Sequence, residues 1–318
     1  MPKSEQFSYA RILGDSVRNL ANKTLVITGA SSGIGRALAI AGARHGANLA
    51  LCDVDVPGLA ATKADVERLG VRVFAAHVNV SDASAMRAFA ADVVSHLGGA
   101  DVVVNNAGVS LSELVGAMKI EDFEWLFSIN FWGVVHGCEA FLPQLRQRPS
   151  AQIVNISSVF GLIGIPGQSA YCASKFAVRG YSESLRAELM GSKIGVTVVH
   201  PGGVKTNIVR NGRHYSDATG VRVDPAVLAR EFENLVQVTP ERAAAVILKA
   251  IRGRQRRVLI GVEAYFFDAL QRLLPASAGQ ILGRLMTQLL KFSRPHSGAV
   301  ETTADVAASG DKKPPLAG

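Results

Sequence analysis

A tyrosine and a lysine that could do acid–base chemistry stand four residues apart, at Tyr171 and Lys175, in a segment with helical character. Both side chains therefore project from one helix face. A phenol is a poor base at neutral pH, but an adjacent ammonium favours its phenolate. Ser158, thirteen residues before the tyrosine at the end of an apolar run, could hydrogen-bond the same substrate oxygen. The three residues predict proton transfer at an oxygen atom; an exposed Tyr–Lys pair is the alternative.

A glycine-rich run suits the binding of a phosphate group. The sequence TGASSGIG, residues 28–35, follows a short apolar run and opens a helix of small residues. Glycine lets the backbone turn tightly and approach a pyrophosphate, whose charge the N–H groups at a helix N-terminus can meet. A turn with no ligand is the alternative, but this position between strand and helix is typical of dinucleotide sites. We predict dinucleotide contacts from Gly29, Ser31, Ser32, Gly33, Ile34 and Gly35.

An acidic residue, Asp53, ends the second apolar run, 18 residues after the glycine-rich turn. A carboxylate at this point accepts hydrogen bonds from the adenosine ribose and repels a 2′-phosphate. Neither Ser32 in the turn nor Val54 after the aspartate is basic. NAD is therefore predicted, and NADP is disfavoured. The alternative interpretation of Asp53 is a helix N-cap, for which Asp55 is a competing candidate.

The elements that must position these residues are apolar runs that alternate with helical stretches. Near-continuous apolar strands between helices indicate a parallel sheet covered on both faces, and right-handed crossovers wind it into a dinucleotide-binding architecture. We predict an α/β fold: a doubly wound, Rossmann-type, seven-stranded parallel sheet with a C-terminal helical extension. The expected strands are 24–28, 48–52, 71–75, 101–104, 152–156, 196–199 and 257–260, and the long helix of the middle region is 123–145.

Composition shifts divide the chain into a core and flanking segments. We predict an N-terminal extension at 1–22, a catalytic domain at 23–262, an amphipathic helical extension at 263–292 and a disordered tail at 293–318. Within the domain, the polar and irregular segment 203–236 is expected to form a lid over the substrate. The extension has three alternative interpretations: packing on the protein's own core, a subunit contact, or a helix at a membrane surface.

Composition also excludes several classes of protein. The chain has 318 residues, is 48% hydrophobic and has a net charge of +8, so it can bury a large core. Three cysteines without close spacing and scattered histidines predict neither a disulfide framework nor a metal site. The basic surplus lacks a nucleic-acid recognition pattern, so no nucleic-acid partner is expected. Without an 18-residue apolar run or an apolar leader, we expect a cytoplasmic protein that could touch a membrane peripherally through 263–292.

Taken together, these motifs resemble the short-chain dehydrogenase/reductase family over residues 20–260. The matches run in order: TGASSGIG at 28–35, Asp53, NNAG at 105–108, Asn130, Ser158, Tyr171 with Lys175, and PGGVKT at 201–206. Family members usually have aspartate where Asn79 stands, in contact with the adenine amino group. The asparagine can accept the same bond through its carbonyl oxygen.

The resemblance implies a role for each matched residue. Tyr171 would be the general acid/base, Ser158 would orient the substrate, and Lys175 would lower the tyrosine pKa and bind the nicotinamide ribose. Asn130 would hold a water that continues the proton relay; a satisfied buried amide is the alternative. The resemblance also assigns cofactor contacts to Asn79, Val80, Asn106, Ala107, Gly108, Tyr171, Lys175, Pro201, Gly202, Val204 and Thr206.

The function implied by the resemblance is NAD(P)-dependent interconversion of an alcohol and its aldehyde or ketone. The amphipathic extension is similar to those of members that act on retinoid-, steroid- or fatty-alcohol-like compounds, which predicts a lipophilic small-molecule substrate. The alternative is an NADPH-dependent 3-oxoacyl or ketone reductase, against which Asp53 argues. A non-catalytic dinucleotide-binding protein is a further alternative, which the complete set of four catalytic residues disfavours. The family resemblance also implies a homodimer or homotetramer.

Overall fold

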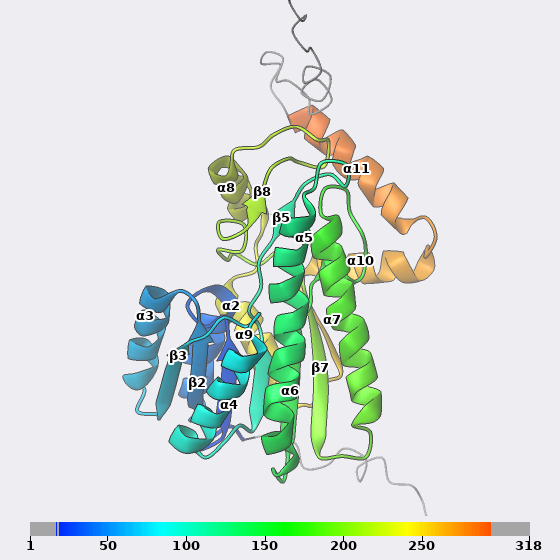
Figure 1. Ribbon diagram of the computed structural model, residues 1–318. Coiled ribbons are helices and arrows are strands. Elements are labelled where there is room, and N and C mark those ends of the chain that lie inside the picture. Colours follow the sequence, from blue (N-terminus) through cyan, green and yellow to red (C-terminus); the bar gives the residue numbers. More distant parts are fainter. Residues whose placement is uncertain (1–16, 18, 294–318) are drawn as a thin grey trace, which may run out of the picture.

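The computed structural model describes residues 17 and 19–293, and a parallel sheet of seven strands forms its centre (Figure 1). The strand order is β3-β2-β1-β4-β6-β7-β9. The Rossmann-type sheet predicted from the sequence is confirmed. The strands are β1 (Thr24–Thr28), β2 (Asn48–Asp53), β3 (Val73–His77), β4 (Val102–Asn105), β6 (Ala151–Ile156), β7 (Ile194–Pro201) and β9 (Arg257–Ile260).

Helices cover both faces of the sheet because the central strands are apolar on both sides. In β1, Leu25 and Ile27 pack into one core cluster, and Val26 between them packs into the other. Alternate side chains of a strand point to opposite faces, so each face receives its own helical layer. One layer contains α2 (Gly33–Arg44), α3 (Val56–Glu67) and α9 (Pro240–Arg252); the other contains α4 (Ala83–Leu97), α6 (Gly133–Arg146) and α7 (Ser169–Glu188).

The strand order reverses beside β1, and this reversal locates the site. The chain runs outward from β1 through β2 to β3 and then returns to β4, which pairs with the other side of β1. Ligands of doubly wound sheets bind outside the carboxyl ends of the strands at such a switch point. Gly29 and Asn106, which follow β1 and β4, are therefore brought to the same crevice.

The long middle helix differs from its predicted form. The range 123–145 is not one α-helix: α5 (Ile120–Phe127) passes through a π-helical turn, Ser128–Trp132, into α6. Apolar periodicity does not reveal an extra residue in a helical turn, and π-helical turns occur frequently at functional sites. This one carries Asn130. The third strand is also two residues later than predicted, at Val73–His77 instead of 71–75.

The segment 203–236 is more ordered than expected. It contains a strand, β8 (Arg213–His214), that pairs in parallel with β5 (Leu111–Ser112), and it contains α8 (Pro225–Leu235). Asp224 caps this helix by accepting hydrogen bonds from two backbone amides of its first turn. Strands of two residues are too short for a periodic signal, so the small sheet could not be predicted from the sequence.

The C-terminal extension forms α10 (Val262–Leu273) and α11 (Ala278–Ser293). One side of the pair packs on the protein's own core, where Phe267 and Leu282 join a cluster with Ile163. The opposite side leaves Tyr265 and Phe266 exposed, at 62% and 58% of their surface. Across the described residues, no helix combines the length and apolar character needed to cross a membrane. The predicted tail beyond 293, and 1–16 of the predicted N-terminal extension, lie outside the described residues.

Candidate active site

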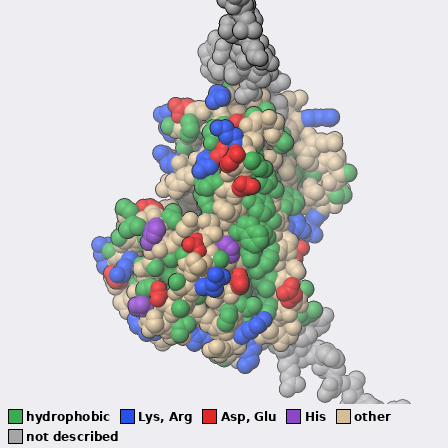
Figure 2. Space-filling view, in the orientation of Figure 1, with side chains coloured by type: hydrophobic (Ala, Val, Ile, Leu, Met, Phe, Trp, Pro, Cys, Tyr) green, Lys and Arg blue, Asp and Glu red, His purple; other side chains and the backbone are tan. Residues whose placement is uncertain are grey.

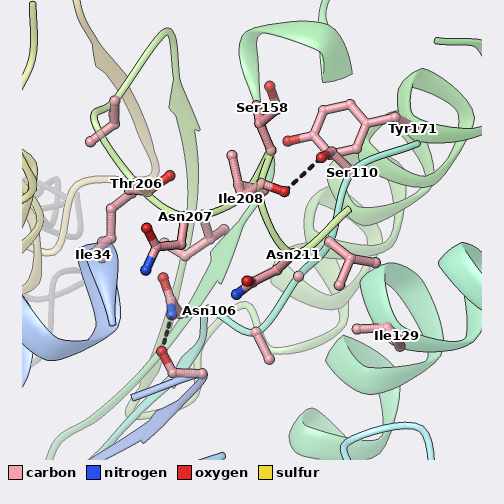
Figure 3. Close-up of a pocket in the computed structure, with 18 of the residues that line it drawn as sticks. Ile34, Asn106, Ser110, Ile129, Ser158, Tyr171, Thr206, Asn207, Ile208 and Asn211 are labelled. Atoms are coloured by element: carbon pink, nitrogen blue, oxygen red, sulfur yellow. Dashed lines mark hydrogen bonds between the residues drawn. The ribbon is translucent and has the colours of Figure 1, made fainter. Parts of the chain in front are cut away.

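A cavity of about 700 Å³ opens at the carboxyl ends of the central strands (Figure 3). Its lining includes every residue that the sequence predicted for catalysis or cofactor binding, except Gly35 and Asn130. The structure therefore brings the glycine-rich turn, Asp53, the NNAG segment and the Tyr–Lys helix to one hollow. The two exceptions lie directly behind the cavity wall.

The glycine-rich turn fits closely against the segment that follows β4. Gly29 has a φ of +66°, and a Cβ there would lie 2.8 Å from the Cα of Ala107. A Cβ at Gly35 would overlap the carbonyl oxygen of Gly29. Gly35 therefore lets α2 begin directly against the turn, although it does not line the cavity. Gly33 and Ile34, the first residues of α2, line the hollow, so a pyrophosphate there would lie at the N-terminus of a helix.

Asn106 ties the first and fourth strands together at the switch point. Its side-chain amide donates to the carbonyl oxygens of Thr28 and Gly29, at 2.9 and 3.1 Å. Its backbone N–H donates to the Thr28 hydroxyl at 3.0 Å. The residue thus fixes the turn relative to β4, and its side-chain amide donates to protein backbone.

Asp53 lies at the edge of the cavity beside the turn. One carboxylate oxygen accepts from the backbone N–H of Ser31 at 2.8 Å, and the other accepts from that of Asp55 at 3.1 Å. The N-cap of α3 is Asp55, which accepts from Gly58 N–H at 3.1 Å. The competing cap role therefore belongs to Asp55, and Asp53 is held with its carboxylate beside the cavity.

Tyr171 and Lys175 are both buried on α7, one helical turn apart. The Lys175 ammonium donates to the carbonyl oxygen of Ile156 at 3.1 Å and lies 5.6 Å from the centre of the tyrosine ring. Ser158 follows β6, and its hydroxyl faces the same part of the cavity as the phenol (Figure 3). The ring of Phe160 meets that of Tyr171 edge-on at 6.3 Å.

Burial sets the proton affinities of this pair. It raises the pKa of Tyr171 to about 12, against a smaller lowering effect of the hydrogen bond to Ser158. It also lowers the pKa of the Lys175 ammonium to about 8. From the sequence we expect Lys175 to lower the pKa of Tyr171. In this structure the net shift is upward, because desolvation of the phenolate is the largest effect.

Asn130 lies fully buried behind the cavity in the π-helical turn. Its carbonyl oxygen accepts from Val109 N–H at 2.8 Å, and its amide donates to the Val109 carbonyl oxygen at 2.9 Å and to the Ser174 hydroxyl at 3.2 Å. A Cβ at Gly108 would lie 3.1 Å from this carbonyl oxygen and 3.4 Å from the Lys175 ammonium. Asn130 is therefore near the lysine, with its amide engaged by protein.

Asn79 lines the cavity but is engaged in a local turn. Its side-chain carbonyl oxygen accepts from the backbone N–H and the hydroxyl of Ser81, at 3.1 and 2.8 Å. The oxygen that the sequence analysis assigned to the adenine amino group thus already accepts two hydrogen bonds.

Sequence reasoning missed the wall on the far side of the tyrosine. Asn207, Ile208 and Asn211 belong to the predicted lid but were not singled out. They line the cavity, and in Figure 3 Ile208 lies beside Ser110 whereas Asn207 and Asn211 lie nearer Asn106. No local motif marks the aromatic and aliphatic residues, which come from separate elements. The apolar residues of this wall are Trp125, Ile129, Val159, Phe160, Ile208, Val209, Leu228 and Phe232.

A buried histidine of β8, His214, joins the lid to the body. Its Nε2–H donates to the hydroxyl of Ser110 at 3.0 Å, because that hydroxyl donates in turn to the Ile208 carbonyl oxygen at 2.7 Å. The Ser112 hydroxyl donates to Nδ1 at 2.8 Å. Burial lowers the pKa of His214, so the imidazole stays neutral and serves both bonds.

Comparison with known proteins decides the family. The model of the short chain dehydrogenase family matches residues 23–216. The chain belongs to this family. The protein SadH of Mycobacterium tuberculosis is 43% identical over 275 residues, which are 86% of this chain and 98% of SadH. A 3-oxoacyl-[acyl-carrier-protein] reductase of Staphylococcus aureus is 36% identical over 187 residues, 58% of this chain and 76% of the reductase.

Solved short-chain dehydrogenases share the fold. One from Burkholderia phymatum, in complex with NAD, has a TM-score of 0.69 and 28% identity, and covers 89% of this chain and 99% of its own. An alcohol dehydrogenase from Thermococcus sibiricus, complexed with 5-hydroxy-NADP, has a TM-score of 0.61 and 27% identity, and covers 75% and 94%. The protein is therefore an oxidoreductase of a family whose solved members bind NAD or NADP.

Proposed function

We propose that this short-chain dehydrogenase prefers NAD and interconverts an alcohol and its aldehyde or ketone on a lipophilic substrate. The observation that carries the proposal is the convergence of Ser158, Tyr171 and Lys175 on the cavity that the glycine-rich turn also lines. A binding-only protein has no need for a buried phenol beside a buried ammonium, because both cost free energy to desolvate.

The residues of the cavity fit a nicotinamide dinucleotide. Gly29 and Gly35 leave the backbone bare where α2 begins, and the Lys175 ammonium lies at the other end, beside Tyr171. When bound, the dinucleotide supplies hydride transfer, which is cofactor chemistry. The residues of the turn would hold its pyrophosphate, and the segment Pro201–Thr206 would hold its nicotinamide end.

The chain's own part in the reaction is proton transfer and orientation. Tyr171 holds its proton at neutral pH and would give it to the carbonyl oxygen during reduction, or take one from the hydroxyl during oxidation. The Ser158 hydroxyl would hydrogen-bond the same oxygen and stabilise charge that develops on it. Lys175 would bind the ribose and favour the phenolate through its charge.

The charge around Asp53 supports the preference for NAD. A 2′-phosphate would meet the Asp53 carboxylate, and Lys175, at the opposite end, is the one cationic side chain among the described residues that line the cavity. Like charges without a compensating cation disfavour binding. A cofactor with a free 2′-hydroxyl avoids this repulsion.

The apolar wall supports a lipophilic substrate. Trp125 carries the Arg213 guanidinium 3.9 Å from its ring centre, and Asp122 pairs with the same guanidinium. The tryptophan is thereby held on the cavity side, opposite the lid helix α8 with Leu228 and Phe232. Burying apolar area of a ligand against such a wall is favourable by about 25 cal/mol per Å².

We also propose a homo-oligomeric assembly and a cytoplasmic protein. Figure 2 shows hydrophobic side chains gathered over the region of α5, α6 and α7. Trp132 and Phe176, at 49% and 40% exposed, belong to this region. Light scattering after gel filtration would measure the mass in solution, and co-sedimentation with anionic lipid vesicles would test peripheral membrane contact through 263–292.

The experiment that tests the function is a panel of alcohols of graded size and polarity, assayed with NAD and with NADP by absorbance of the reduced coenzyme. The panel includes a 3-hydroxyacyl thioester, which separates the alternative of a 3-oxoacyl reductase. We expect kcat/KM to rise with apolar size and to be higher with NAD. Highest activity on the thioester with NADP would contradict the proposal. If no alcohol led to reduction of either coenzyme, the proposal of an alcohol dehydrogenase would be wrong.

A further inference from the structure

A glutamate of the C-terminal extension reaches the wall of the cofactor cavity from behind. Glu263 stands in the first turn of α10, and its carboxylate oxygen Oε1 accepts a hydrogen bond from the backbone N–H of Gly203 at 2.8 Å. Gly203 and its neighbour Gly202 line the cavity, whereas Glu263 does not. No lysine, arginine or histidine among the described residues forms an ion pair with Glu263. The carboxylate is thus directed at backbone of the cavity wall.

The glycines around this carboxylate leave space that a side chain would take. A Cβ at Gly202 would overlap Oε1 of Glu263, and one at Gly261 would lie 2.5 Å from the same atom. Gly261 also has a φ of +92°, and it is the residue from which α10 begins. Gly202 follows β7 and Gly261 follows β9, and the absence of a side chain at both lets the Glu263 carboxylate lie against the backbone. A helix that began on an open surface would not need glycine at both positions.

The contact between Glu263 and Gly203 holds only a short segment of the cavity wall, between Gly202 and Lys205. Gly202 N–H donates to the carbonyl oxygen of Ile260 at 2.8 Å, which continues the pairing of β7 with β9. Further along, Lys205 N–H donates to the Val238 carbonyl oxygen at 2.9 Å. Between these two anchors, the backbone N–H of Gly203 donates to the side-chain carboxylate of Glu263. The glutamate therefore supplies the acceptor for the Gly203 N–H in the segment between them.

We infer that Glu263 is a positioning residue for the nicotinamide half of the cofactor site. It holds the backbone at Gly203, so that the wall facing the nicotinamide is formed before the cofactor binds. The inference rests on the proposed function, which assigns the segment Pro201–Thr206 to the nicotinamide end. The pyrophosphate end is held separately, by the glycine-rich turn and Asn106, and should not depend on the glutamate.

The test compares two ligands on the full-length protein: NADH, followed by its fluorescence, and ADP-ribose, which lacks the nicotinamide, followed by calorimetry. In Glu263→Ala, we expect the NADH dissociation constant to rise about tenfold, as loss of a hydrogen bond to a charged acceptor implies, and the ADP-ribose constant to stay within about twofold. Equal weakening of both ligands, or no weakening of NADH, would overturn the inference.

Two conservative variants separate positioning from charge. Glu263→Gln keeps the reach and the acceptor oxygen, and we expect NADH binding within about threefold of wild type. Glu263→Asp keeps the charge but draws the carboxylate back by one methylene, and should behave as Glu263→Ala does. The reverse order, with Asp like wild type and Gln like Ala, would show that the charge at the helix start is what matters and would overturn positioning.

A matched control and the wild type complete the experiment. Glu241 is an exposed glutamate in the first turn of α9, and Glu241→Ala should leave both ligands unchanged. If wild type and Glu263→Ala bind NADH equally well, the inference about Glu263 is wrong and the proposed function stands. A wild type that binds neither NADH nor NADPH overturns the proposed function and the inference with it.

Discussion

The Lys175 ammonium lies 5.6 Å from the centre of the Tyr171 ring, and its hydrogen bond goes to the carbonyl oxygen of Ile156. The lysine thus influences the phenol through its electric field, at a distance where a buried charge still acts strongly. Burial moves the two proton affinities apart: it raises the tyrosine pKa from 10.0 to about 12 and lowers the lysine pKa from 10.5 to about 8. The pair is therefore arranged so that the phenol keeps its proton and the ammonium can lose its own.

Replacing Tyr171 by phenylalanine tests the proton-transfer role directly. Tyr171→Phe removes the hydroxyl and keeps the ring that packs on Phe160, so the fold should persist. Loss of a general acid costs about 10²- to 10⁴-fold, and we expect kcat to fall by at least that factor. NADH binding, measured by fluorescence, should stay near wild type. Substantial residual turnover would remove the phenol from the mechanism.

The direction of the reaction should determine its pH dependence. Oxidation of the alcohol needs phenolate, and because the Tyr171 pKa of about 12 lies above the working range, the phenolate fraction grows with pH. We expect kcat/KM for oxidation to rise by up to tenfold per pH unit from about pH 6 to the Lys175 pKa of about 8, and less steeply above it, because the lysine then loses its charge. Reduction uses the protonated phenol and should be flat, then decline above the Lys175 pKa of about 8. Oxidation rates that do not change with pH would contradict this assignment.

The roles of Asp53 and Asp55 can be distinguished by replacing each with alanine. Asp53→Ala removes the carboxylate that faces the cavity, so the ratio of kcat/KM for NAD to that for NADP should fall by about tenfold or more. Asp55→Ala removes the N-cap of α3 and should cost about 1 kcal/mol of stability with the ratio unchanged. If the cofactor ratio is the same in both variants, Asp53 does not discriminate between the two cofactors.

The sequence predicted the parts of the fold and site that local physics determines. The run TGASSGIG needs glycine at Gly29 and Gly35 because of backbone conformation and close approach, and both needs are visible in the order of residues. Tyr171 and Lys175 share a helix face through their spacing alone. The alternation of apolar strands and helices was enough to predict the seven-stranded sheet.

Contacts between distant segments could not be predicted in this way. Trp125 and Leu228 line the same cavity from elements that are about a hundred residues apart, and neither carries a local motif. The pairing of β5 with β8 rests on two residues in each strand, too few for a pattern. Glu263 reads as an ordinary acidic residue at a helix start, and only its position against Gly203 gives it a role.

A buried histidine behind Ser158 should make the stability of the protein depend on pH. His200 is fully buried, its Nδ1–H donates to the Ser158 carbonyl oxygen at 3.0 Å, and its Nε2 has no partner in the part of the chain that the structure describes. Desolvation lowers the pKa of His200 from 6.5 to about 4. The unfolded chain therefore binds one more proton than the folded chain between these two values, so the free energy of unfolding falls as pH falls through this window.

The contribution of His200 can be isolated by subtraction. His200→Asn keeps a side-chain donor near the Ser158 carbonyl oxygen and does not titrate. Over the window from the unfolded pKa down to the folded one, we expect wild type to lose about 3 kcal/mol more unfolding free energy than the variant. Urea unfolding at a series of pH values measures this, with His77→Asn as a control at an exposed histidine. Parallel stability curves for wild type and His200→Asn would mean that the buried imidazole accepts a proton without cost, and that the backbone of Ser158 is held by other contacts.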